Sequence, residues 1–152
     1  MLRTCVQCGT DNRVPAKFLA AKGKCGCCKG VLGPIAEPID VDLTTFDALV
    51  KETRVPIFID FWAAWCGPCR MVAPEVKAMA QSLAGQAIVL KVDTERDPEL
   101  AARFSIQSIP TFVILRDGRV VGRRSGYAIA ADLATWVQAS AGGAAAVGTA
   151  RA

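Results

Sequence analysis

The chain has 152 residues and a net charge of +4, with 52% hydrophobic and 21% charged residues. This length and composition predict one ordinary globular domain plus a small appendage, and they exclude global disorder. Histidine is absent, which excludes Cys–His catalysis, Cys2His2 zinc sites and haem ligation through histidine. The apolar runs are far shorter than the roughly 18–20 residues of a membrane span, and no apolar signal segment follows Met1. We therefore expect a cytoplasmic protein with no membrane partner.

The first 33 residues differ from the rest of the chain. They carry six basic side chains against Asp11 alone, and they hold five of the seven cysteines. With so few large apolar residues, this segment cannot bury enough surface to fold without a stabilising cross-link or metal ion. In a cytosolic protein, grouped cysteines indicate metal binding or catalysis rather than structural disulfides. We predict a metal-binding domain over residues 1–33 and a short linker over residues 34–38.

Two Cys-x-x-Cys pairs in this segment have the spacing of a four-cysteine zinc site. Cys5 and Cys8 form the first pair, and Cys25 and Cys28 form the second, with 16 residues between the pairs. A closed Zn²⁺ site of this kind is structural and supplies folding free energy. Iron in the same ligands, a pair of disulfides and a redox-sensing role are the alternatives. Cys27 is predicted to be a non-ligand, because Cys25 with Cys28 fits the spacing rule better.

From residue 39 onward, helical and strand-like segments alternate. A first helix can be capped by Thr44 or Thr45, and its apolar face carries Phe46, Leu49 and Val50. The later segments, in chain order, are a buried strand over 55–62, a helix over 66–83 kinked at Pro74, a strand over 87–93, a short helix from 97 or 98 to 104, a hairpin over 111–115 and 120–124, and a helix over 130–139. This order predicts an α/β fold, with a mixed sheet covered by helices on both faces. The domain would span residues 39–140, and an Ala/Gly-rich tail over 141–152 is expected to be frayed or disordered.

A third Cys-x-x-Cys pair, Cys66 and Cys69, follows the buried strand directly and opens a helix. The positive end of the helix favours a thiolate at Cys66, and Cys69 is close enough to form a disulfide with it. This setting predicts a redox pair rather than two inert core cysteines or a second zinc site. Asp60 is a carboxylate in an otherwise apolar strand, where burial would raise its pKa. The alternative for Asp60 is a solvent-facing strand end.

Two segments resemble a known family. The run from Asp60 to Pro74, with Trp65-Cys66-Gly67-Pro68-Cys69 at its centre, is similar to the active-site segment of thioredoxins. Ser108-Ile109-Pro110-Thr111-Phe112 is similar to the cis-proline segment of that family, and Asp117, Gly118 and Gly126 fall where its hairpin and a later loop glycine belong. The resemblance covers about residues 39–140. Together with the N-terminal cysteine pairs, the chain resembles the zinc-containing thioredoxin-2 subgroup in particular.

The resemblance implies a thioredoxin fold and a protein-disulfide reductase. In that family, the residue matching Cys66 attacks a substrate disulfide, and the residue matching Cys69, expected to be the more buried, releases the product. The match implies that Asp60 is the general base for Cys69 and that Pro110 is cis. The implied docking surface consists of Trp65, Gly67, Pro68, Ile109, Pro110, Ser125, Gly126 and Tyr127. Alignment on Asp93 puts the lysine that the family has near Asp60 at Val89, with Lys91 two residues further along.

The resemblance also implies partners, and two alternative functions remain. It implies recharging by an NADPH-dependent thioredoxin reductase, client proteins with disulfides, no bound organic cofactor and a monomer. A disulfide isomerase or oxidase is the nearest alternative. A binding module is another, in which the basic N-terminal segment docks a nucleic acid or a client protein. No aromatic residues alternate with the basic residues around the cysteine pairs, which argues against nucleic acid.

Overall fold

A computed structural model describes residues 1–141, so all of the predicted tail except Ala141 lies outside the described residues. The N-terminal part contains two antiparallel hairpins. In the first, β1 (Leu2–Thr4) pairs with β2 (Asp11–Arg13), and in the second, β3 (Gly23–Lys24) pairs with β4 (Val31–Leu32). A short 3-10 helix, η1 (Ala16–Phe18), lies between the hairpins. Residues 1–33 are called the N-terminal unit below.

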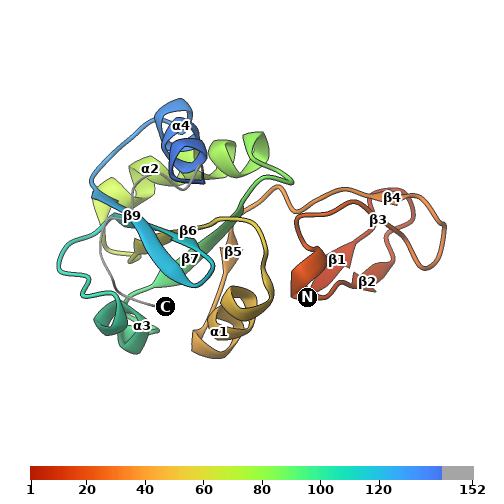
Figure 1. Cartoon of the computed structure of the whole chain (residues 1–152), viewed down its shortest axis with the longest axis horizontal. Coiled ribbons are helices and arrows are strands. Elements are labelled where there is room, and N and C mark those ends of the chain that lie inside the picture. Colours follow the sequence, from red (N-terminus) through yellow and green to blue (C-terminus); the bar gives the residue numbers. More distant parts are fainter. Residues whose placement is uncertain (142–152) are drawn as a thin grey trace.

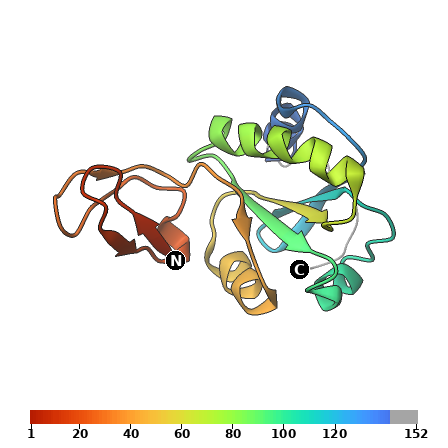
Figure 2. The ribbon, with the colours of Figure 1, turned by 180° about the vertical axis from the view of Figure 1, so that it is seen from behind.

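The rest of the described chain builds a five-stranded sheet in the order β5-β7-β6-β8-β9. β5 (Ile39–Asp40), β7 (Ile88–Asp93) and β6 (Ile57–Trp62) are parallel, whereas β8 (Thr111–Arg116) and β9 (Arg119–Ser125) form antiparallel pairs. α2 (Gly67–Ser82) and α4 (Ala130–Ala141) cover one face, and α1 (Leu43–Glu52) and α3 (Pro98–Arg103) cover the other (Figures 1 and 2). The predicted mixed sheet with helices on both faces is confirmed.

The central strand β6 shows why this sequence forms a two-sided core. Ile57, Ile59 and Phe61 belong to the apolar cluster that includes residues of α1 and α3. Phe58 points the other way and belongs to the cluster that includes residues of α2 and α4. Because successive side chains of a strand alternate, a strand buried on both faces reads as an unbroken apolar run. Asp60 falls on the same face as Phe58.

The start of α1 differs from the prediction. The N-cap is Asp42, whose carboxylate oxygen accepts a hydrogen bond from the Thr45 backbone N–H at 2.8 Å. The predicted caps, Thr44 and Thr45, lie inside the helix. Asp42 is a better cap because its negative charge also stabilises the positive end of the helix. The strand β5 was not predicted, since two residues carry no periodicity.

The N-terminal unit joins the core of the main sheet. Leu19, which follows η1, is fully buried in the same cluster as Phe46 of α1. Ile35, inside the predicted linker, is 6% exposed in this cluster, and its backbone N–H donates to the Leu19 carbonyl at 2.8 Å. Residues 34–38 therefore connect the two parts with a buried anchor at Ile35.

Candidate active site and cysteine cluster

The turn from β6 into α2 places Cys66 at the helix N-cap. Cys66 has an extended backbone, and its Sγ accepts a hydrogen bond from the Cys69 N–H at 3.2 Å. Pro68 lies in the first turn, where its missing N–H costs nothing because that group has no partner in a helix start. The positive end of α2 therefore faces Cys66 Sγ, the position at which a thiolate is most stabilised.

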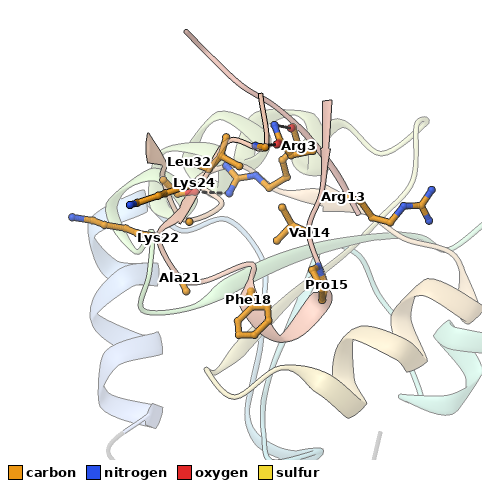
Figure 3. Close-up of a pocket in the computed structure, with 13 residues that line it drawn as sticks. Arg3, Arg13, Val14, Pro15, Phe18, Ala21, Lys22, Lys24 and Leu32 are labelled. Carbon is orange, nitrogen blue, oxygen red and sulfur yellow. Dashed lines mark hydrogen bonds between the residues drawn. The ribbon is translucent and has the colours of Figure 1, made fainter. Parts of the chain in front are cut away.

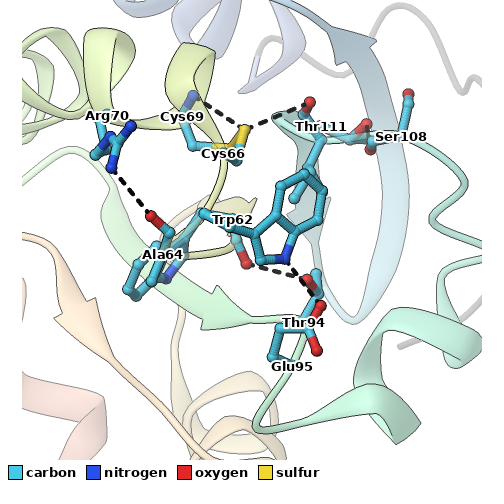
Figure 4. Close-up of a disulfide and its surroundings, with 11 residues drawn as sticks. Trp62, Ala64, Cys66, Cys69, Arg70, Thr94, Glu95, Ser108 and Thr111 are labelled. Carbon is cyan, nitrogen blue, oxygen red and sulfur yellow. Dashed lines mark hydrogen bonds between the residues drawn. A yellow bond between two sulfur atoms is a disulfide. The ribbon is translucent and has the colours of Figure 1, made fainter.

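Cys66 and Cys69 form a disulfide in this structure (Figure 4). Their Cα atoms are 5.2 Å apart, which is ordinary for a disulfide. Both residues are 3% exposed, so the expectation that Cys69 is the more buried is wrong. Both lie under apolar neighbours, Trp62 and Ile109, which limit the access of solvent to the sulfurs.

The segment facing the disulfide contains the cis Ile109–Pro110 peptide bond that the resemblance implied. Cys66 Sγ lies 3.8 Å from the Ile109 carbonyl oxygen. Pro110 itself is buried, and its carbonyl accepts a hydrogen bond from the Gly126 N–H at 3.0 Å. Gly126 has φ +90°, which a residue with a side chain rarely adopts. The two candidate docking segments, around Pro110 and Gly126, are thus bonded to each other beside the disulfide.

An exposed aromatic surface borders the disulfide. Trp65 is 68% exposed, and its indole N–H donates to Glu95 Oε1 at 3.0 Å. A hollow of about 260 Å³ opens beside its ring, lined by Trp65, Thr94, Ala101, Ile106, Gln107, Ser108 and Ile109. Figure 4 shows Thr94 and Glu95 on one side of the disulfide, and Ser108 and Thr111 on another.

The other predicted docking residues also lie near the surface. Tyr127 is 51% exposed, Ser125 and Pro68 are exposed, and Gly67 is partly exposed. Thr94 and Glu95, which follow β7, were not predicted from the sequence. Their position could have been inferred from the strand order, because the carboxyl ends of neighbouring parallel strands, here β6 and β7, lie at the same edge of a sheet.

Asp60 is buried beneath this surface. It is 1% exposed, and burial raises its pKa to about 7, although the positive charge of Lys91 lowers it. Lys91 lies in register with Asp60 across the β6–β7 pair, while Val89 pairs with Phe58 and packs in the core. The alignment that placed the family lysine at Val89 is therefore wrong, and the cation beside Asp60 is Lys91. The Lys91 ammonium also lies 4.4 Å from the ring centroid of Trp62.

The four predicted metal ligands come together in the N-terminal unit. The Sγ atoms of Cys5, Cys8, Cys25 and Cys28 all lie within 4.8 Å of one another. The Cys5–Cys28 and Cys8–Cys25 sulfur distances are both 3.7 Å. A tetrahedron with metal–sulfur bonds of about 2.3 Å has sulfur–sulfur edges of about 3.8 Å, so the cluster fits a Zn²⁺-sized ion.

Backbone N–H groups and side-chain donors surround the sulfurs of the cluster. The Cys27 N–H donates to Cys25 Sγ and the Gly30 N–H donates to Cys28 Sγ, both at 3.4 Å. Hydrogen bonds from Thr10 lower the pKa of the Cys8 thiol to about 6. The Asn12 side-chain N–H donates to Cys25 Sγ at 3.5 Å, and its Oδ1 accepts the Gly26 N–H at 2.8 Å, contacts that were not predicted from the sequence. Asn12 thereby ties the first hairpin to the second.

Cys27 lies outside the ligand group. Its side chain is exposed and does not belong to the set of four converging sulfurs. Its backbone N–H, rather than its thiol, contacts the cluster.

Comparison with known proteins identifies the fold and its chemistry. The sequence model described as Thioredoxin matches residues 37–139. The chain belongs to the thioredoxin family. Thioredoxin C-3 of Corynebacterium nephridii is 38% identical over 137 residues, which is 90% of this chain and 93% of that protein. This match is longer than the chain from residue 37 onward, so it includes part of the N-terminal unit.

Further thioredoxins match shorter parts of the chain. Thioredoxin 1 of Chlorobaculum tepidum is 46% identical over 82 residues, covering 54% of this chain and 81% of that protein. A solved mutant thioredoxin from Halobacterium salinarum has a TM-score of 0.66 and 29% identity, over 74% of this chain and 96% of that one. This thioredoxin is accordingly a thiol-disulfide oxidoreductase, and its Cys66–Cys69 disulfide has the sequence position and setting of a redox-active pair. Among residues 1–141, no helix is long and apolar enough to cross a membrane.

Proposed function

We propose that this thioredoxin reduces protein disulfides through a cycle of the Cys66–Cys69 pair. The observation that carries the proposal is the position of Cys66. It caps α2, is bonded to Cys69, and lies against the Ile109 carbonyl of the cis-proline segment. An attacking thiolate needs a stabilising positive environment and a resolving partner, and this arrangement offers both.

The cycle starts from the dithiol. The Cys66 thiolate attacks one sulfur of a substrate disulfide, forming a Cys66–substrate bond and releasing the other substrate sulfur as a thiolate, which takes up a proton. Cys69 then loses its proton and attacks Cys66 Sγ. The mixed disulfide breaks, the second substrate sulfur leaves, and the Cys66–Cys69 disulfide forms. Two electrons have passed from the protein to the substrate.

Asp60 is proposed as the base that takes the Cys69 proton. A pKa of about 7 leaves the carboxylate partly ionised near neutral pH, so that it can both accept and return a proton. The Lys91 charge keeps this pKa from rising further. The opposing effects of burial and Lys91 thus hold Asp60 in the range where a general acid–base group is useful.

An extended substrate segment is proposed to dock beside Cys66. Trp65 and Tyr127 supply exposed aromatic surface, and Gly67 with Pro68 forms the start of α2. The cis-proline segment with Ile109 and Pro110, and the Ser125–Gly126 segment bonded to it, form the other part of this surface. Such a surface of apolar contacts and backbone groups accepts many sequences, as a general reductase requires.

A Zn²⁺ ion is proposed to bind Cys5, Cys8, Cys25 and Cys28, which would place the chain in the zinc-containing thioredoxin-2 subgroup. The converging sulfurs and their N–H donors support this. Bound by four thiolates, the ion would have no open position and would contribute folding free energy to the N-terminal unit. Elemental analysis of protein purified under reducing conditions should give one zinc per chain. Iron, or no metal, would contradict the assignment.

The proposed partners are an NADPH-dependent thioredoxin reductase, which would return electrons to Cys66–Cys69, and client proteins that contain disulfides. We propose a monomer in a reducing cytoplasm, without a bound organic cofactor. The predominance of matches to thioredoxins, and the bifunctional thioredoxin reductase/thioredoxin of Mycobacterium leprae among them, support the reductase partner.

The test is reductase-coupled reduction of insulin disulfides. Wild-type protein should consume NADPH, and Cys66→Ser should abolish turnover because the attacking thiolate is gone. Turnover in Cys66→Ser would refute the assigned nucleophile. The rival oxidase or isomerase function is separated by equilibrating the pair with glutathione: a strongly oxidising potential would contradict the reductase.

A further inference from the structure

A basic hollow in the N-terminal unit has no role in the disulfide chemistry. Its volume is about 350 Å³, and it lies between the two hairpins (Figure 3). Val14, Phe18 and Leu32 give it an apolar lining. Its cationic side chains are Arg3, Arg13, Lys22 and Lys24, and this hollow is called the basic pocket below. Pockets that combine an apolar lining with a few charged groups commonly bind ligands.

The positive charge of the basic pocket is uncompensated. The lining contains no aspartate or glutamate. In the described part of the chain, the two ion pairs are Arg96–Asp97 and Arg103–Asp47, neither of which reaches the pocket. The Arg3 guanidinium instead donates to the Gly33 and Pro34 carbonyls. Carbonyls fix the guanidinium in place without neutralising it, so a cation is held ready for an anionic partner.

The arrangement of the cations favours several separate negative charges. Figure 3 shows Lys22 and Lys24 extending on one side of the pocket, whereas Arg13 extends away on the other side. Binding of a single phosphate would require these groups to converge on one point, and they do not. Carboxylates spaced along a peptide match such a spread of charge.

The aromatic ring in the pocket favours an apolar side chain over a nucleotide base. Phe18 is 51% exposed, but the Lys17 ammonium lies 5.0 Å from its ring centroid. The ammonium occupies one face of the ring, which leaves a stacking base at most the other face. The exposed part of the ring, together with Val14 and Leu32, can still contact an aliphatic side chain.

The basic pocket lies far from the redox pair. Gly85, just beyond the end of α2, approaches the Ala20 carbonyl of the N-terminal unit, with 3.5 Å between that oxygen and the position of a Cβ. Cys66 caps the opposite end of this helix of 16 residues, which is about 24 Å long. A partner held at the pocket would leave Cys66 open to a disulfide elsewhere on the same partner.

We propose that the basic pocket binds an acidic peptide segment of partner proteins, with an aliphatic side chain in the hollow and flanking carboxylates on the cations. This contact raises the effective concentration of the partner's disulfide at Cys66. The proposal rests on the proposed function only in that the partner carries a disulfide. Binding itself is independent of the redox cycle and can be measured alone.

The test uses full-length oxidised protein and a fluorescein-labelled peptide of alternating glutamate and leucine, without cysteine. Fluorescence anisotropy should show binding at about 50 mM salt that weakens as salt screens the charges. The double variant K22E/K24E should bind at least about tenfold more weakly. The matched control K51E/K77E changes the net charge equally but at exposed sites in α1 and α2, and should bind as wild type. Circular dichroism and metal content check that each variant is folded.

Three results would overturn the proposal. One is the absence of binding to wild-type protein, and another is an equal loss in both double variants, which would indicate only net charge. The third is tighter binding of AMP or inorganic phosphate than of the peptide, which would assign the pocket to a phosphate ligand. Insulin reduction by wild type alongside these results would show that the disulfide cycle is intact, so the two proposals fail separately.

Discussion

Truncation of Leu19 tests whether the N-terminal unit and the sheet domain form one cooperative structure. Leu19 is fully buried beside Phe46 and Ile35, in the core cluster that continues to β6. Leu→Ala changes at such sites cost about 2–5 kcal/mol, from lost burial plus the cavity that remains. With a urea dependence of about 2 kcal/mol per molar, Leu19→Ala should lower the unfolding midpoint by about 1–2.5 M.

Tryptophan fluorescence is the assay, because Trp62, Trp65 and Trp136 all lie outside the N-terminal unit. Leu2→Ala is the matched control: the same substitution in the same unit, but at a side chain that is 66% exposed. It should leave the midpoint nearly unchanged. If Leu19→Ala also left the tryptophan-detected midpoint unchanged, the unit would unfold independently and the reasoning from the shared core would be refuted.

Three further predictions concern Asp60, the cysteine cluster and β9. Burial raises the Asp60 pKa from 3.8 to about 7, so ionisation of Asp60 lowers the stability of the wild type progressively between about pH 4 and pH 7. The stability of oxidised Asp60→Asn relative to wild type should therefore rise by up to about 4 kcal/mol between pH 4 and pH 9, measured by urea unfolding. A difference that stays constant with pH would contradict this. Cys27→Ser should keep one zinc per chain by elemental analysis whereas Cys25→Ser should lose it, and loss in both would make Cys27 a ligand. Gly122→Ala should lower stability by about 1–3 kcal/mol in thermal unfolding, since its Cβ would lie 2.9 Å from the Trp136 ring, and an unchanged midpoint would show that the ring moves aside freely.

The active-site segments could be predicted from sequence because their information is local. Cys66 and Cys69 lie in consecutive residues that also define a helix start, and Pro110 lies in a short distinctive segment. The cation beside Asp60 could not be placed so easily. It depends on the register between β6 and β7, and anchoring the alignment on Asp93 shifted that register by two residues. A register shift of two residues leaves the side chain on the same face of the sheet but puts a different residue there. Val89 and Lys91 were therefore both possible neighbours of Asp60.

Contacts across the N-terminal unit were the least predictable part. Leu19 lies in a short segment without periodicity, and its apolar neighbour Phe18 is half exposed, so the sequence did not indicate which of the two is buried. Asn12 is 13 positions before Cys25, and the hydrogen bond that its amide donates to the Cys25 sulfur follows only from how the hairpins meet. The cysteine spacing predicted which residues converge, because a metal site constrains its ligands directly. It did not predict what supports them.

The order of the sheet leaves β5 and β9 as its two edges. An unpaired edge can recruit an extended segment of another chain, and the two edges are protected in different ways. Arg119, Arg123 and Arg124 lie on β9, which also has a register irregularity opposite Ile114 and Leu115. At β5, only two residues long and preceded by Pro38, residues of β1 lie across a shared hollow. A chain beginning at residue 34 would lack that neighbour. Self-association of such a chain would therefore be explained first by the uncovered β5 edge, and only then by the missing cysteines.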